Sequence, residues 1–221
     1  IPYAGVTYDL TDYLTAYASY TDVFMPQEFY NLDRNSKMLD PDEGENYEIG
    51  LKSEFFDGRL NASLAYFEVK ESNRPIPDDA WNNLSPTPPN YAFKGTSAKT
   101  KGYELEISGE LSPGWSLQGG YTHKVVRDDT GKKISTFEPE DQLSFYTIYK
   151  LKGDLNKVSV GGGARWQSTA WQEMYNSPKD RYEDFSQKPY WVVDLMTRYQ
   201  FTKNLSTTLN VNNVFDKYYF T

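Results

Sequence analysis

The chain has 221 residues and carries 23 Lys and Arg against 31 Asp and Glu, which gives a formal net charge of −8. Because nucleic-acid binding requires clustered cations, this acidity without a long basic run argues against a nucleic-acid partner. The sequence holds no cysteine and one histidine. These counts exclude disulfides and thiolate metal sites, and they leave little room for a histidine-based metal centre.

Aromatic residues make up 16% of the chain, with 19 Tyr, 12 Phe and 5 Trp, although the chain as a whole is polar. It contains no run of about 18 apolar residues, the length that a membrane helix needs. Many Tyr and Trp in a polar chain are instead typical of a membrane β-barrel, because only every second residue of each strand meets lipid.

Alternation of apolar and polar residues predicts about ten β-strands and no competing helix. In WSLQGGYTHKV, for example, Leu117 and Tyr121 share one face and Gln118 and Thr122 share the other. The predicted strands cover, in chain order, residues 1–10, 13–24, 46–56, 59–70, 98–110, 115–127, 140–151, 156–171, 188–201 and 204–214.

The connections between these strands alternate in length. Tight turns with Gly, Pro, Asn or Asp, such as Asp57-Gly58, follow every second strand. Between them lie long polar loops near 25–45, 71–97 and 172–187, and a shorter loop near 128–139. The pattern predicts an all-β, antiparallel, up-and-down transmembrane β-barrel segment with short periplasmic turns and long extracellular loops.

The spacing of aromatic residues along one predicted strand agrees with the length that a strand needs to cross a membrane. Trp191 and Phe201 share one face ten residues apart. At ~3.3 Å per residue and ~40° tilt they are ~25 Å apart along the membrane normal, the height of the apolar band. We expect Tyr13 and Trp115 at the periplasmic rim and aromatic residues such as Tyr20 at the outer rim. A soluble β-sandwich remains the structural alternative.

Four segments resemble TonB-dependent outer-membrane receptors for ferric siderophores, and within them the receptors for pyoverdine and hydroxamate siderophores. They are YASYTDVFMPQ at 17–27, LDPDEGENYEIGLKSEFFDGRLNASLAYFEVK at 39–70, TKGYELEISGELSPGWSLQGGYTH at 100–123 and NVNNVFDKYY at 210–219. The resemblance runs from end to end. It implies that residues 1–221 are the C-terminal portion of a barrel of about 22 strands, with the plug domain and the final strand absent.

The resemblance also implies a function. Such receptors bind an extracellular ferric siderophore and import it with energy coupled through TonB, which would act through the missing N-terminal region. The expected location is the outer membrane of a Gram-negative bacterium, with the lipid bilayer as a partner. No cofactor of the protein is expected, because ferric iron arrives chelated by its ligand. Two alternatives stay open, namely a complete ten-stranded outer-membrane enzyme and a soluble β-domain that binds carbohydrate.

Ligand-binding candidates lie where strands meet the long loops, since aromatic faces and a few polar groups can enclose a bulky chelate there. Gln27, Phe29 and Tyr30 follow one strand top, close to positions where the family places aromatic ligand contacts. Phe29 and Tyr30 would alternatively pack their loop.

A second group of ligand-binding candidates lies where the strand expected at 156–171 meets the long loop near 172–187, and comprises Arg165, Gln167, Trp171 and Tyr175. Arg165 could bind ligand carboxylates bidentately, or it could pair with a carboxylate of the plug or of the barrel wall, such as Glu104, Glu106 or Asp194.

The other residues that the sequence singles out do not form a recognisable catalytic motif. His123 falls on the outward phase of its strand without a nucleophile motif nearby. The acidic loop segments, including PDDAW at 77–81, are expected to be solvated rather than calcium loops. Gly161, Gly162 and Gly163 interrupt a strand and predict close backbone approach. No catalytic residue and no metal ligand is predicted.

Overall fold

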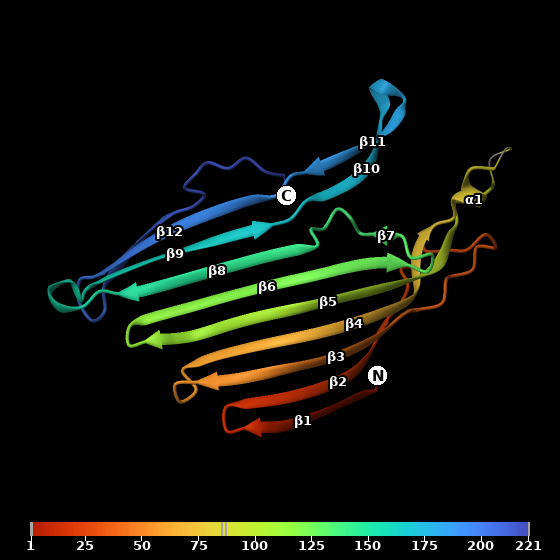
Figure 1. Cartoon of the computed structure of the whole chain (residues 1–221). Helices are drawn as coiled ribbons and strands as arrows, with labels where there is room; N and C mark the ends of the chain where they lie inside the picture. The colour runs from red at the N-terminus through yellow and green to blue at the C-terminus, as the bar shows by residue number, and fades with distance from the viewer. Residues whose placement is uncertain (1, 85, 87, 221) are drawn as a thin grey trace.

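The fold comes from a computed structural model that describes residues 2–84, 86 and 88–220. In this part of the chain, eleven strands form one antiparallel sheet, in which β7 pairs with β6 and the other ten follow chain order (Figure 1). Strands β10 and β11 form a separate two-stranded sheet. The strands are β1 (Tyr3–Thr11), β2 (Leu14–Met25), β3 (Asp42–Phe55), β4 (Leu60–Pro77), β5 (Phe93–Ser112), β6 (Trp115–Asp128), β7 (Lys133–Ile134), β8 (Asp141–Lys150), β9 (Val158–Gln167), β10 (Ala170–Asn176), β11 (Arg181–Gln187), β12 (Tyr190–Gln200) and β13 (Ser206–Val211).

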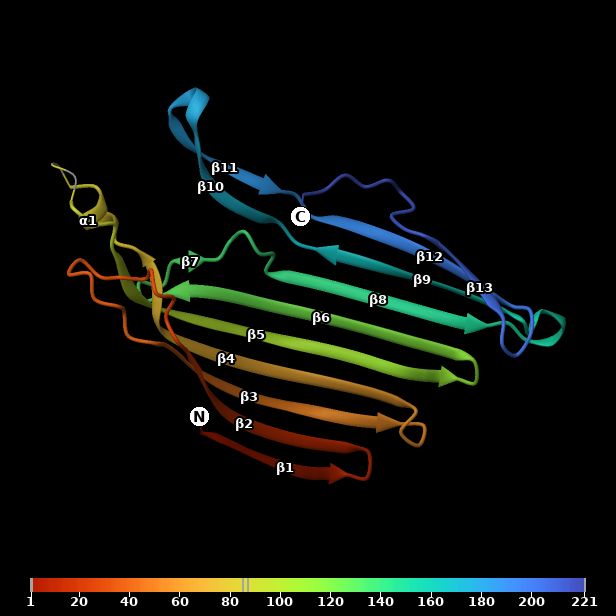
Figure 2. The ribbon, with the colours of Figure 1, turned by 180° about the vertical axis from the view of Figure 1, so that it is seen from behind.

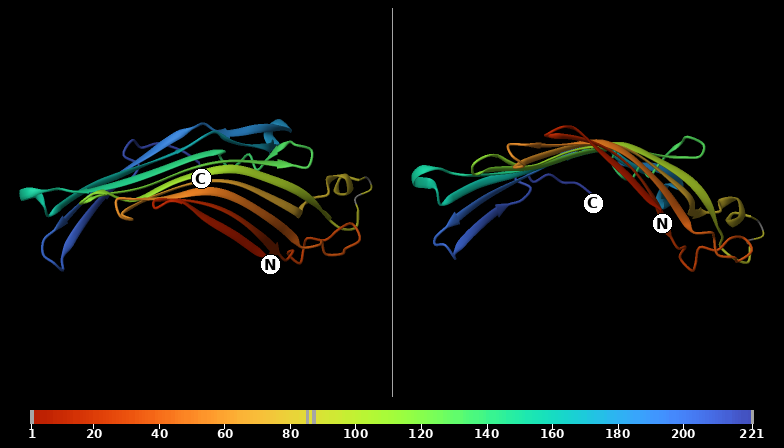
Figure 3. Two further views of the ribbon diagram at one scale, coloured as in Figure 1. Left: turned by 60° about the horizontal axis from the view of Figure 1, so that its bottom comes forward. Right: turned by 90° about the horizontal axis from the view of Figure 1, so that it is seen from below.

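The large sheet is one curved layer. The short turns lie together at one end of the strands and the long connections at the other, as both faces of the ribbon show (Figures 1 and 2). Seen along the other directions, the layer is arched like a section of a cylinder wall (Figure 3). Helical segments are short: α1 (Asp79–Asn82) and two 3₁₀ turns, Gly153–Leu155 and Ser177–Lys179. None of the helices in the described part of the chain is long and apolar enough to cross a membrane.

Strand register keeps the two faces of the sheet chemically distinct. Leu64, for example, lies opposite Leu51 on β3 and Leu105 on β5, and Leu105 lies opposite Tyr121 on β6. We call this side the apolar face. The opposite, polar face carries both charge signs, with Glu48, Lys52, Glu104, Glu106, Arg165, Asp194 and Arg198 on it. A one-residue slip in any pair would exchange the faces, so the alternation fixes the register.

Aromatic pairs mark both ends of the apolar face. Their ring centroids lie between 5.0 and 6.5 Å apart. Near the short turns the pairs are Tyr13–Phe55 and Trp115–Tyr149, and near the long connections they are Tyr20–Tyr47 and Trp166–Trp191. This arrangement confirms the two aromatic rims expected from sequence, which in a membrane barrel lie at the two lipid–water interfaces.

Glycines on the polar face receive aromatic rings from the neighbouring strand. Gly50 lies directly opposite Tyr17, and Gly163 lies directly opposite Tyr146. A Cβ atom on Gly50 would approach Tyr17 Cε1 to 2.6 Å, and one on Gly163 would approach Tyr146 Cδ2 to 2.7 Å. Only glycine leaves space for these rings. The close approach expected at 161–163 is confirmed.

All ten predicted strands are present, but the predicted loops are wrong in part, because each of them holds strand residues. Strands β4 and β5 continue to Pro77 and back from Phe93, inside the loop expected at 71–97. The loop expected at 172–187 holds most of the β10–β11 hairpin, and the strand expected at 156–171 ends at Gln167. These segments extend past the aromatic rim, where no apolar face is required, so alternation does not reveal them.

Candidate functional site

The long-loop end of the sheet carries a cross-braced structure that we call the loop platform. It consists of the β2–β3 loop, residues 26–41, and the tip of the β4–β5 hairpin, residues 78–84 and 88–92. Arg34 Nε donates to Asp78 Oδ2 at 2.5 Å, and Arg34 Nη2 donates to Asp78 Oδ1 at 3.0 Å. The residue Asp78 is only 3% exposed, whereas the Arg34 side chain is 49% exposed. The guanidinium lowers the pKa of Asp78 below the usual carboxyl range.

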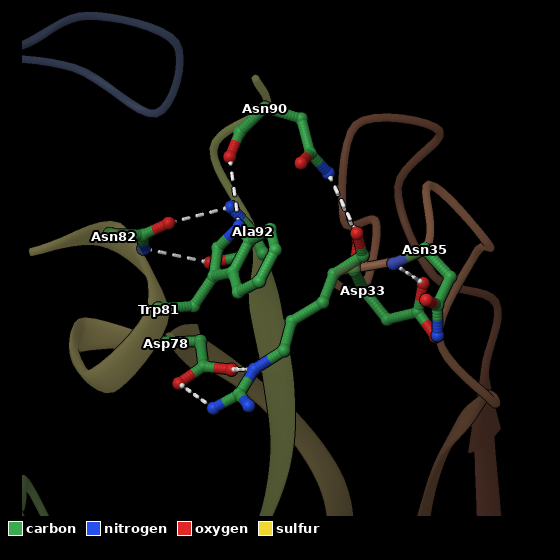
Figure 4. A network of polar contacts seen from close by, with 8 residues as sticks. Asp33, Asn35, Asp78, Trp81, Asn82, Asn90 and Ala92 are labelled. Carbon is green, nitrogen blue, oxygen red and sulfur yellow. Dashed lines mark hydrogen bonds and ion pairs between the residues drawn. The ribbon is translucent and has the colours of Figure 1, made fainter. Parts of the chain in front are cut away.

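Further hydrogen bonds close the tip of the β4–β5 hairpin, and one of them joins the tip to the β2–β3 loop (Figure 4). Asn82 Nδ2 donates to the Ala92 carbonyl at 2.9 Å, and the Ala92 backbone N–H donates back to Asn82 Oδ1 at 2.8 Å. Trp81 Nε1 donates to the Asn90 carbonyl at 3.1 Å, and Asn90 Nδ2 donates to the Asp33 carbonyl at 3.3 Å. Each half of the platform therefore supports the other.

The platform corrects one sequence expectation. The acidic PDDAW segment is not simply solvated, because Asp78 is buried and paired with Arg34. A buried carboxylate needs such a partner to offset its lost hydration. Asp33 has a different role, since its carboxylate accepts backbone N–H groups of Asn35 at 2.8 Å and Lys37 at 2.9 Å. These bonds lower the pKa of Asp33 and shape the loop.

The first group of predicted ligand contacts lies on this platform. Gln27 Nε2 donates to the carbonyls of Asp40, at 2.9 Å, and Asn73, at 2.8 Å, and its Oε1 accepts from Asn31. Its amide thus holds the loop in place. Phe29 and Tyr30 are 82% and 56% exposed, with their rings edge-on at 5.3 Å. These two rings do not bury themselves in the loop and remain free to meet a ligand.

The second group lies on the polar face of β9 and on β10. Arg165 Nη2 lies 3.4 Å from Asp194 Oδ2, so the pairing expected with a wall carboxylate is present. Arg165 and Gln167 line a hollow of ≈ 330 Å³ together with Tyr190 and Tyr219. The rings of Tyr190 and Tyr219 stack with centroids 4.7 Å apart.

Trp171 and Tyr175 belong to β10, outside the large sheet. Trp171 is 40% exposed, and its backbone N–H donates to the Thr136 carbonyl at 2.7 Å. Tyr175 pairs through its backbone with Tyr182 of β11, while its side chain lies outside the described part of the structure. In the sheet order, β3, β4, β5, β6 and β8 separate β2 from β9. The two predicted groups therefore stand on separate parts of the mouth, and their contact with a ligand stays a prediction.

Tyr190 was not among the sequence candidates. Its position on the polar phase of β12, two residues before Val192, was readable from alternation, but its stack on Tyr219 joins two separate segments. The platform residues Arg34 and Asp78 were also missed, because their pairing spans 44 positions of sequence. Periodicity detects strands, not contacts between loops.

His123 and Asp141 form a polar pair on the apolar face. His123 Nδ1 lies 2.7 Å from Asp141 Oδ1, and the imidazole stacks on Tyr103 with centroids 5.0 Å apart. Tyr121 also donates to Asp141 at 2.7 Å. The outward orientation expected for His123 is confirmed, and it places the pair at the aromatic rim, away from the polar face. Within the described residues, no group of three His, Asp or Glu is arranged to hold a metal ion.

Comparison with known proteins identifies the family to which this chain belongs. The family described as "TonB dependent receptor-like, beta-barrel" matches residues 1–214. The chain belongs to this family. Its arched sheet is accordingly part of an outer-membrane β-barrel of Gram-negative bacteria, its apolar face meets lipid, and its polar face lines the lumen.

Similar sequences in this family include the ferripyoverdine receptor of Pseudomonas aeruginosa, which is 63% identical over 100% of this chain and 27% of its own length. The ferric-pyoverdine 358 receptor of Pseudomonas putida is 42% identical over 99% of this chain and 26% of its own length. The chain thus spans about a quarter of the length of these relatives.

Solved structures agree with the sequence comparison. The crystal structure of the Pseudomonas aeruginosa ferripyoverdine receptor bound to ferripyoverdine superposes with a TM-score of 0.94 at 62% identity, covering 99% of this chain and 29% of that one. The alcaligin outer-membrane receptor of Bordetella pertussis superposes with a TM-score of 0.74 at 39% identity, covering 96% of this chain and 34% of that one.

Proposed function

We propose that the protein containing this chain is an outer-membrane receptor that binds an extracellular ferric siderophore of the pyoverdine type and imports it with energy coupled through TonB. The observation that carries this proposal is the 63% identity to a ferripyoverdine receptor, which extends over the whole chain. The chain would supply part of the barrel wall and of the extracellular mouth. The plug and the segment that engages TonB would be supplied by other parts of the protein.

The geometry of the mouth supports a binding role. Exposed aromatic faces, Phe29 and Tyr30, stand on a braced platform, and a lumen arginine, Arg165, lies in a hollow beside Tyr190. Aromatic rings offer large contact surfaces at low entropic cost, and a guanidinium offers directional donors to carboxylate or hydroxamate oxygens. A ferric siderophore brings its iron already chelated, so the protein need not supply metal ligands.

The proposal is tested with the complete protein. It is produced in a Pseudomonas strain that lacks its own pyoverdine receptors, and uptake of ⁵⁵Fe-labelled pyoverdine is measured with and without TonB. We expect uptake that requires both the receptor and TonB. Ferrioxamine B labelled in the same way serves as the comparison ligand.

Binding is measured separately by tryptophan fluorescence of the purified complete receptor. We expect ferripyoverdine to quench this fluorescence at far lower concentration than ferrioxamine B does. Equal or absent quenching by a panel of pyoverdines, together with absent uptake, would contradict the assignment. Quenching without uptake would retain ligand binding and reject transport.

A further inference from the structure

The segment that follows β13 leaves the sheet and runs back beside β12. Strand β13 ends at Val211, and residues 212–220, which we call the strap, lead toward the base of the β10–β11 hairpin (Figures 1 and 2). Two residues of the strap have a left-handed backbone, Asn213 with a φ of 51° and Asp216 with a φ of 49°. Asn and Asp adopt this conformation more readily than most residues, so the sequence favours a bend here.

Asn213 closes this bend with its own side chain. Its Oδ1 accepts from the Lys217 backbone N–H at 2.9 Å, and its Nδ2 donates to the Lys217 carbonyl at 3.0 Å. The Asp216 backbone N–H donates to the Asn213 carbonyl at 2.8 Å. Residues 213–217 therefore form a loop with its own hydrogen bonds, and contacts with β12 and with the hairpin set its position on the wall.

The lower end of the strap is bonded to Asp194 on the polar face of β12. Asp194 Oδ1 accepts from the Asn213 backbone N–H at 2.8 Å, and the Val193 carbonyl accepts from the Val214 backbone N–H at 2.8 Å. A hydrogen bond to a charged acceptor contributes more than one to a neutral acceptor, so the carboxylate is the stronger anchor. Its other oxygen, Oδ2, lies 3.4 Å from Arg165 Nη2.

The upper end of the strap forms one side of the hollow beside Arg165. The Tyr219 ring stacks on the Tyr190 ring, with centroids 4.7 Å apart and planes 21° apart, and both tyrosines line the hollow. The Phe220 backbone N–H donates to Gln187 Oε1 at 3.0 Å, which fixes the strap to the base of the hairpin. The strap therefore carries an aromatic wall of the hollow at the end away from its carboxylate anchor.

We propose that Asp194 is a positioning residue for the ferric siderophore site, an inference that rests on the proposed function. Its carboxylate holds the strap so that Tyr219 stays stacked on Tyr190, in the hollow that Arg165 also lines. The aromatic wall and the guanidinium are then in place before the chelate arrives, which reduces the entropic cost of binding. Asp194 acts through the strap and does not touch the ligand.

The test is a double-mutant cycle in the complete receptor, with the Kd for ferripyoverdine measured by tryptophan fluorescence quenching. We expect Asp194→Ala and Tyr219→Ala each to raise the Kd about tenfold. Because both changes act on one strap, the double variant should also bind about tenfold more weakly, and not about 100-fold. Arg198→Gln is the matched control on the same face of β12, bonded to Gln200 and Ser206, and should leave the Kd unchanged.

A conservative variant separates the strap from the ion pair. Asp194→Asn keeps an oxygen that accepts from the Asn213 backbone N–H, but it loses the charge beside Arg165. We expect its Kd to lie within about twofold of the wild-type value. Without ligand, amide exchange at Asn213 and Val214 should stay slow in Asp194→Asn and accelerate about tenfold in Asp194→Ala. A Kd as high in Asp194→Asn as in Asp194→Ala would assign the effect to Arg165 and reject the role of the strap.

Other outcomes also decide against the inference. Multiplicative effects in the double variant, or an unchanged Kd in Asp194→Ala, would overturn it while the proposed function stands. Slow exchange at Asn213 in Asp194→Ala would show that the carboxylate does not hold the strap. Absent quenching in the wild type would instead contradict the proposed function and, with it, this inference. Wild-type exchange in β3 to β5 reports that each variant is correctly folded.

Discussion

The loop platform and the β10–β11 hairpin both rise from the long-loop end of the sheet, but they are held in different ways. The platform is braced across distant segments by the pairing of Arg34 with the buried Asp78 and by the hydrogen bond from the Asn90 amide to the Asp33 carbonyl. In the hairpin, two ion pairs, Lys179–Glu183 and Arg181–Glu183, lie within the hairpin itself. A two-stranded sheet alone is marginally stable. We therefore expect the loop platform to be rigid and the β10–β11 hairpin to open locally more easily.

Near its base the hairpin contacts the rest of the chain. Trp171 donates through its backbone to Thr136, and Gln187 Oε1 accepts from the Phe220 backbone N–H at 3.0 Å. The Phe185 ring meets the Phe220 ring edge-on at 5.1 Å. A ligand that touches both regions would find the platform ready and would have to order the hairpin.

Hydrogen exchange of the complete receptor in detergent should reveal this difference most clearly. We expect amide protection in the β10–β11 hairpin to be about 100-fold lower than at the bonded platform amides, such as those of Trp81 and Ala92, because local opening of the ribbon breaks few contacts. Equal protection in the two regions would show that the hairpin is held by parts of the receptor outside this chain.

The substitution Arg34→Glu should remove most of the difference in amide protection between the platform and the hairpin. It places a second carboxylate against the buried Asp78, and we expect exchange at Trp81 and Asn82 to accelerate about 30-fold. Arg181→Glu reverses a charge whose ion pair lies within the hairpin, and it serves as the control. Exchange at the platform should stay unchanged in that variant. A platform that keeps its protection in Arg34→Glu would show that the amide network suffices without the ion pair.

Truncation of an exposed platform ring should have a moderate effect. We expect Tyr30→Ala to raise the Kd for ferripyoverdine about fivefold, since an aromatic contact typically contributes at this level. Most of the change should appear as faster dissociation, because the platform is already formed before binding. Phe56→Ala, which truncates an exposed ring in the turn at the opposite end of the sheet, should leave the Kd unchanged. An unchanged Kd in Tyr30→Ala would remove this residue from the predicted site.

Acid should have the smallest effect over the ordinary pH range. The pKa of Asp78 is lowered by Arg34, so the pair contributes its full stability above the ordinary carboxyl pKa, about 4. That contribution is lost only as the pH falls through the lowered pKa. Exchange at Trp81, corrected for intrinsic rates, should therefore be constant from pH 8 to pH 5. Loosening of the platform already at pH 5 would contradict the assigned role of Asp78.

Sequence reasoning predicted the wall of the barrel much better than its mouth. Within the bilayer every second residue of a strand meets lipid, so apolar residues such as Leu64 alternate with polar residues such as Ser63. This alternation located the strands. Above the rim, Pro77 and Phe93 still lie in paired strands, although nothing requires one face there to be apolar. The Arg34–Asp78 pair and the Tyr190–Tyr219 stack depend on chain folding between distant segments, which no local pattern encodes.

The glycine positions on the polar face have a consequence for the width of the passage. Because Tyr17 lies over Gly50 and Tyr146 lies over Gly163, these large rings rest flat along the wall instead of pointing toward the barrel axis. A larger residue in place of Gly50 or Gly163 would push the neighbouring tyrosine ring toward the lumen by the thickness of a methyl group or more. The clearance available to whatever fills or crosses the bore is thus set by the smallest side chains in the wall.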